Sequence, residues 1–247
     1  MSYVIITSFN EEGYNLYAKD MLKSFKKFWK KDIELEAWYH DCKLPKDAPK
    51  ASNITYKNLN NVKDMLNYRE KMSKHDGTHG GTVKYDWRRD SIKWCHKVYA
   101  MTEAARNRMG SSKWLIWLDA DTVTHKPVPE KFLNELCKKE VDILHLGRTD
   151  IDYSETSFLG FNLLSIMARE FLEDMRGCYN MGETTAYREW HDGFIFDRLL
   201  KIHMAHGLIA HNLTPVVKGL DAFHQSPLND YLLHFKGNKK FGDVNAT

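Results

Sequence analysis

Two carboxylates one residue apart follow an apolar run, in the segment WLIWLDADTV at residues 114–123. Successive side chains of an extended segment point to opposite faces, so Asp119 and Asp121 point to the same side. Mg²⁺ and Mn²⁺ prefer oxygen ligands, and in proteins they often bind one or two carboxylates together with phosphate oxygens of a substrate. The segment therefore predicts a divalent cation site at the tip of a buried strand, suited to phosphate chemistry.

Strand and helix patterns alternate on both sides of this segment, in a chain of 247 residues of which 43% are hydrophobic. A chain of this size and composition can bury a large core. The alternation predicts an α/β fold with a mainly parallel sheet flanked by helices. We expect strands at 3–8, 33–39, 53–56, 114–118, 142–146, 158–164, 208–213 and 231–235. We expect helices at 14–28, 62–74, 89–109, 131–138, near 176 and at 183–206, the last with a break near Gly193.

Neither a repeat nor a low-complexity linker divides the chain, so we expect one domain over residues 1–247. Its net charge of +3 fits a protein that handles anionic ligands. The 4 cysteines are widely spaced and form no CxxC pair, which favours a reducing compartment. No apolar run is long enough for a membrane span, and we expect a cytoplasmic protein.

Four segments, in this order, resemble the nucleotide-sugar glycosyltransferases of the GT-A fold. VIITSFNEEGYNLYAKDMLKSF is similar to the nucleotide-binding start of these enzymes, and RRDSIKWCHKVYAM to the basic helix before their metal motif. WLIWLDADTVTHKPV resembles the metal-binding strand, and HFKGNKK the closing H-F-x-G-x-x-K motif of the retaining, glycogenin-like group. The resemblance implies a GT-A domain with a nucleotide-binding half at 1–125 and an acceptor half at 126–247.

The resemblance implies a metal-dependent hexosyl- or pentosyltransferase that uses Mn²⁺ or Mg²⁺ and a nucleotide-sugar donor, with UDP-sugars as the usual donors. His234 would complete the metal ligands Asp119 and Asp121. A cation and basic side chains at this place would neutralise the charge that grows on the leaving nucleoside diphosphate. The expected donor-binding residues are Thr7, Ser8, Arg89, Lys93, Lys97, Asp119, Lys236, Gly237 and Lys240.

Two sets of these residues are also expected to bind the donor because of their positions in the predicted elements. Thr7 and Ser8 end the first strand, where open α/β sheets bind ligands. Arg89, Lys93 and Lys97 are spaced four residues apart and share a helical face, which either contacts the donor or is simply solvated.

The acceptor half offers Asp192, in REWHDGFIFDRL, as the catalytic carboxylate, with Asp197 as the second choice. A structural alternative is that Asp192 only caps or breaks the helix at Gly193. The acceptor is expected to be a hydroxyl of a glycan or of a hydroxymethylated base in phage DNA. Small enzymes of this kind occur in bacterial surface-glycan pathways and in bacteriophages, which would place the protein in a bacterial cell or a phage-infected host.

Two other functions are compatible with the same residues. LDADTV also satisfies the D-x-D-x-T/V pattern of haloacid-dehalogenase-type phosphatases, with Thr149 as a candidate for their later Ser/Thr. In those enzymes, however, this strand normally opens the domain, whereas here more than a hundred residues precede it. The last alternative is a binding module that keeps the GT-A fold and has lost the activity.

Overall fold

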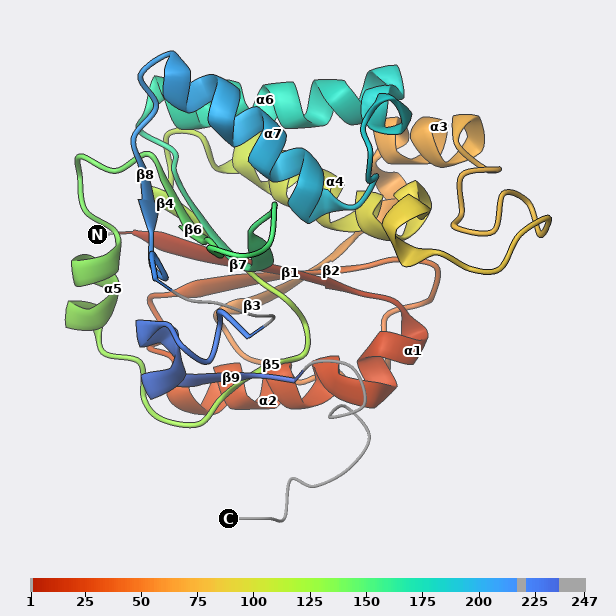
Figure 1. The fold of residues 1–247 in the computed structure, drawn as a ribbon. Helices are drawn as coiled ribbons and strands as arrows, with labels where there is room; N and C mark the ends of the chain where they lie inside the picture. The colour runs from red at the N-terminus through yellow and green to blue at the C-terminus, as the bar shows by residue number, and fades with distance from the viewer. Residues whose placement is uncertain (1, 217–220, 236–247) are drawn as a thin grey trace.

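The computed structural model describes residues 2–216 and 221–235, and its centre is a seven-stranded sheet with the order β3-β2-β1-β4-β7-β6-β8 (Figure 1). Only β7 runs antiparallel to its neighbours in this sheet, so the expected mainly parallel sheet is confirmed. Strands β5 and β9 form a separate antiparallel pair. The strands are β1 Tyr3–Phe9, β2 Glu34–Tyr39, β3 Ile54–Asn58, β4 Trp114–Leu118, β5 Thr122–Thr124, β6 Ile143–Leu146, β7 Glu155–Asn162, β8 Ala210–Asn212 and β9 Leu232–His234.

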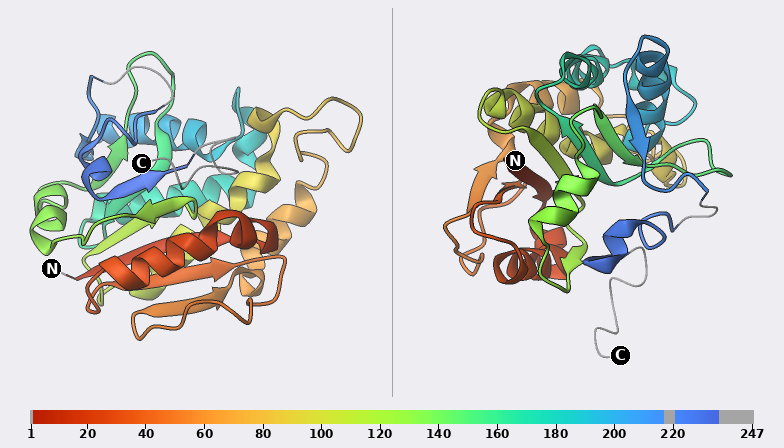
Figure 2. Two further views of the ribbon diagram at one scale, coloured as in Figure 1. Left: turned by 90° about the horizontal axis from the view of Figure 1, so that it is seen from below. Right: turned by 90° about the vertical axis from the view of Figure 1, so that its left-hand side faces the viewer.

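Helices cover both faces of the sheet (Figures 1 and 2). Four helices, α3, α4, α6 and α7, lie on one face, while α2 and the β5–β9 pair lie on the other, with β5 packed against α2. A π-helical turn at Tyr14–Ala18 joins α1 to α2. The helices are α1 Glu11–Gly13, α2 Lys19–Phe28, α3 Lys63–Lys71, α4 Ser91–Arg108, α5 Glu130–Leu136, α6 Ile166–Met181 and α7 Asp192–Ala205.

The first four residues of β1 are all apolar because both faces of the strand are buried. Val4 and Ile6 are buried in the core beneath α3, α4, α6 and α7, whereas Tyr3 and Ile5 are buried in the core on the α2 face. A strand covered on both faces needs apolar side chains at successive positions, because its side chains alternate between the two cores.

Parallel strands bring three chain segments to one edge of the sheet. Strands β1, β2 and β4 all end at this edge, where the His40 amide donates to the Phe9 carbonyl at 3.1 Å. Strand β9 then pairs with β5 so that His234 lies opposite Thr122. A residue close to the end of the sequence is thereby placed beside the tip of β4.

Of the helix expected over 183–206 with a break near Gly193, only the part from Asp192 onward is α-helical, and the part before it is wrong. A 3-10 turn covers Glu183–Ala186, and α7 begins only at Asp192, with the His191 side chain accepting the Phe194 amide at its start. The intervening backbone pairs with the loop before α4, since the Trp190 amide donates to the Arg88 carbonyl at 2.6 Å. This long-range contact competes with helix formation, and a local sequence pattern does not contain it.

All four cysteines are free thiols. No helix among the described residues is long and apolar enough to cross a lipid bilayer.

Strand β9 offers a test of its own packing, because Leu232 is buried and its neighbour Leu233 is only half-buried. We expect Leu232→Ala to lower the free energy of unfolding by about 2–5 kcal/mol, as for other buried leucines. Leu233→Ala is the matched control and should cost clearly less. Urea denaturation of both variants checks this, and equal losses would contradict the burial of Leu232.

Candidate functional site

Asp119, Asp121 and His234 meet at the tip of β4, where each offers one ligand atom and these atoms lie within 4.8 Å of one another. His234 Nε2 is 3.1 Å from Asp121 Oδ1 and 3.9 Å from Asp119 Oδ2. Two carboxylates and an imidazole are a donor set that Mn²⁺ accepts, with room for substrate oxygens to complete the coordination. The three side chains thus fit a divalent cation.

The two oxygens of Asp119 face different partners. Oδ1 accepts hydrogen bonds from Lys97 Nζ at 2.8 Å and from the Trp117 indole at 2.7 Å. Oδ2 faces His234. Lys97 and Trp117 therefore fix the carboxylate while its second oxygen points toward the cation position.

Glu155, at the start of β7, holds the other side of the His234 ring. Its Oε1 lies 3.2 Å from His234 Nδ1 and accepts from the Ser157 hydroxyl at 2.9 Å, while Oε2 accepts the Ala222 amide at 3.0 Å. A carboxylate behind a ligating histidine fixes the ring and raises its basicity as a ligand. Sequence reasoning missed this role, although the polar run Glu-Thr-Ser at the start of a strand buried on both faces was a usable signal.

His234 is charged in the absence of a metal. Burial alone would lower its pKa, but the contacts with Asp121 and Glu155 and the nearby Asp119 outweigh burial and raise the pKa to about 9. A cation that binds Nε2 must displace this proton, so metal and proton compete for the site.

Lys97 links the candidate metal-binding group, Asp119, Asp121 and His234, to Asp192. Its Nζ lies 2.9 Å from Asp192 Oδ2, and the Thr156 hydroxyl donates to the same oxygen at 2.6 Å. Burial opposes both charges, yet Asp119 and Asp192 raise the pKa of Lys97, and Lys97 lowers the pKa of Asp192. Asp192 is therefore an ionised carboxylate in the first turn of α7, and it reaches the site through this buried ion pair.

A cleft of about 350 Å³ opens beside the metal-binding group, within the size range of small-molecule sites. Ser8 and Lys93, which the sequence analysis expected to bind the donor, lie in its wall. The full lining is Ser8, Phe9, Asn10, Tyr17, His40, Asp41, Lys93, Trp94, His96, Lys97, Trp117, Asp119, Ala120 and Asp121.

A histidine pair that sequence reasoning did not find forms another part of this wall. His40, after β2, stacks on His96 of α4, with ring centroids 3.7 Å apart. Asp41 Oδ2 lies 3.1 Å from His40 and 3.6 Å from His96, and Arg69 donates to the other oxygen at 2.7 Å. Burial lowers the pKa of both histidines, to about 3 for His96, so the pair is neutral. The residues come from distant segments, and their spacing gives no sequence signal.

The remaining predicted residues lie elsewhere. Thr7 is fully buried within β1 and is not part of the cleft wall, and Asp197 lines a separate cavity. Arg89 does not share a helical face with Lys93 and Lys97, because it precedes α4 and its guanidinium lies over the Trp190 ring at 5.5 Å. Lys236, Gly237 and Lys240 lie outside the described residues.

Solved glycosyltransferases share this architecture. Mouse xyloside xylosyltransferase 1, in its apo form, matches with a TM-score of 0.53 at 13% identity over 93% of this chain and 92% of that one. A glycosyltransferase involved in the glycosylation of the major capsid of PBCV-1 also matches with a TM-score of 0.53, at 12% identity over 97% of this chain and 95% of that one. The expected GT-A fold is thereby confirmed.

No family model matches the sequence. No curated protein matches it either.

The contact between Glu155 and His234 predicts a pH dependence of stability. The folded pKa of His234 is raised from 6.5 to about 9, so its stabilising contribution is complete below 6.5 and disappears as the pH rises through 9. Without metal, the free energy of unfolding should fall over this pH interval, and less so in Glu155→Gln. Urea denaturation in EDTA at several pH values measures both, and identical pH profiles would show that Glu155 does not act on His234.

Proposed function

We propose that the protein is a metal-dependent glycosyltransferase that moves a sugar from a nucleotide-diphosphate donor, a UDP-sugar, to an acceptor hydroxyl. The observation that carries the proposal is the convergence of Asp119, Asp121 and His234 beside the cleft, on a fold shared with two glycosyltransferases. Residues from the middle and the end of the chain form this group, which is hard to explain as a by-product of packing. In this proposal residues 1–125 bind the nucleotide and residues 126–247 receive the acceptor.

Asp119, Asp121 and His234 would hold Mn²⁺ or Mg²⁺ between them. The bound ion would neutralise charge on the leaving nucleoside diphosphate. Lys97 keeps Asp119 oriented, and Lys93 and Ser8 would contact the donor from the cleft wall. Lys236, Gly237 and Lys240 keep their proposed place at the diphosphate on the strength of the sequence motif.

Asp192 would act on the sugar and its acceptor. It is ionised and lies at the far side of Lys97 from the metal-binding group. From there a carboxylate can stabilise positive charge on the reacting carbon of the sugar or accept the proton of the attacking hydroxyl. Its place in the first turn of α7 is compatible with this role, since His191 caps the helix.

The phosphatase alternative has no support in the structure. Three strands precede β4 in the chain, and Thr149 lines a cavity separate from the cleft that contains Asp119. A GT-A binding module without activity would keep the same geometry, so only a measured rate of sugar transfer separates it from an enzyme.

The metal assignment predicts that Asp121→Ala loses metal-dependent donor binding. Titration calorimetry with UDP and Mn²⁺ should show that the affinity for UDP falls by more than about 100-fold. The loss is this large because the substitution removes a metal-binding side chain itself, not a residue that only orients such a side chain. Asp20→Ala, an exposed aspartate on α2, is the matched control and should bind normally. Unchanged UDP affinity in Asp121→Ala would refute the metal site.

The catalytic assignment predicts a different defect for Asp192→Asn. This variant should bind UDP with Mn²⁺ as the wild type does, because Asp192 is not a metal ligand. Its rate of sugar transfer should fall by about 100-fold or more, as when general acid–base catalysis is removed. Donor binding by calorimetry and turnover with the same donor are compared, and near-normal turnover would remove Asp192 from the mechanism.

A further inference from the structure

An aromatic wall stands between the cleft and α7, formed by Trp87, Trp94, Tyr153 and His191. We propose that this wall binds a saccharide and that a saccharide is the acceptor of the proposed transferase. The inference rests on the proposed function and names the acceptor class of the same site.

The four rings come from three chain segments, and two of their contacts are edge to face while Trp87 and His191 are tilted at 44°. Trp87 and Trp94 have centroids 6.3 Å apart at 73°, Trp87 is 5.0 Å from His191, and Tyr153 is 4.5 Å from His191 at 71°. The Trp94 indole is fixed by a hydrogen bond to the Trp87 carbonyl at 3.0 Å. Trp87 itself remains 37% exposed, so an indole of a rigid cluster is open to a ligand.

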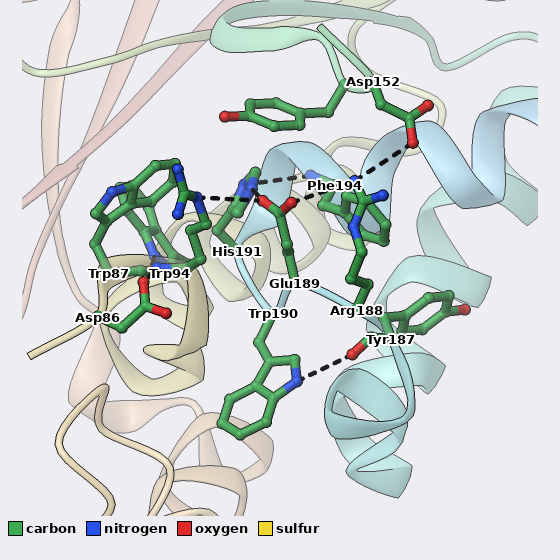
Figure 3. A network of polar contacts seen from close by, with 12 residues as sticks. Asp86, Trp87, Trp94, Asp152, Tyr187, Arg188, Glu189, Trp190, His191 and Phe194 are labelled. Atoms are coloured by element: carbon green, nitrogen blue, oxygen red, sulfur yellow. Dashed lines mark hydrogen bonds and ion pairs between the residues drawn. The ribbon is translucent and has the colours of Figure 1, made fainter. Parts of the chain in front are cut away.

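The polar groups around the wall are also fixed, through Glu189 (Figure 3). One oxygen of Glu189 lies 3.0 Å from His191 Nε2 and 4.0 Å from Arg88, and the other lies 3.3 Å from Arg188. Burial lowers the pKa of His191, and its Nδ1 accepts the Phe194 amide, so the neutral ring donates from Nε2. The wall thus combines flat apolar faces with a carboxylate, a guanidinium and an imidazole at its rim.

The wall continues into the proposed reaction site. Trp94 and Lys93 line the cleft, and His191 directly precedes Asp192 in the chain. A ligand lying on Trp87 and Trp94 would reach along the cleft toward Lys97, which lines the cleft with Trp94 and pairs with the buried Asp192. This is the position that an acceptor needs.

The polar groups of the wall match a saccharide. A sugar ring offers an apolar face to an indole and hydroxyls to carboxylates and amides, which matches a pocket with a few fixed polar groups. Proteins that bind single-stranded DNA also combine aromatic rings with cations. Cations lie over three rings of this wall, Arg88 over Trp87 at 5.3 Å, Lys93 over Trp94 at 5.1 Å and Arg148 over Tyr153 at 4.8 Å, and the test therefore includes an oligonucleotide.

The test measures acceptor binding without the donor. Methyl glycosides of glucose, galactose, xylose and N-acetylglucosamine, and a ten-nucleotide oligothymidine, are titrated into the full chain and followed by saturation-transfer NMR. We expect at least one glycoside to bind, and Trp87→Ala to weaken it by about tenfold, a typical loss for one stacking contact. Trp87→Phe should keep most of the binding. Leu164→Ala, an exposed residue just after β7, is the matched control and should change nothing.

UDP binding with Mn²⁺ is measured on the same proteins and should be equal in all of them. A wild type that does not bind UDP would refute the proposed transferase, while glycoside binding that depends on Trp87 would still support the wall. The inference is overturned if no glycoside binds, if Trp87→Ala binds glycosides as the wild type does, or if only the oligothymidine binds.

Discussion

The site depends on the compensation of buried negative charge at the tip of β4. Lys97 lies between Asp119 and Asp192, and His234 lies between Asp121 and Glu155. Removing carboxylates from water is costly unless each meets a positive charge or good hydrogen bonds. Lys97 and His234 supply this positive charge in the absence of a metal. A divalent cation would supply part of it instead, in place of the proton of His234.

This constraint explains several features of the fold together. Helix α4 must place Lys97 against the end of β4, and β7 must carry Glu155 and Thr156 to the same edge of the sheet. The short β5–β9 pair brings His234 beside Thr122, from which it is more than a hundred residues distant in the chain. On the other side, α7 begins at Asp192, so the carboxylate that pairs with Lys97 is fixed at a helix start next to the aromatic wall.

The sequence predicted the sheet and the two carboxylates Asp119 and Asp121 because both leave local patterns, whereas His234 was expected only from the family resemblance. Apolar strand runs locate β1 and β4, and the Asp-x-Asp at a strand end marks the cation position from residue types and spacing alone. The same patterns could not predict the role of Glu155 or the pair of His40 and His96. Each of these depends on contacts between segments distant in the chain, for which one sequence offers neither spacing nor periodicity. Arg89 shows the opposite error, since a regular spacing suggested a helical face that the N-terminal end of α4 does not reach.

The most direct test is a crystal structure with Mn²⁺ and UDP, with anomalous diffraction recorded to locate the manganese. The account predicts one anomalous peak at bonding distance from Asp119, Asp121 and His234, with the UDP diphosphate bound to the same ion. A peak at His40, Asp41 and His96 instead, where three ligand atoms also lie close together, would contradict it, as would UDP bound without manganese.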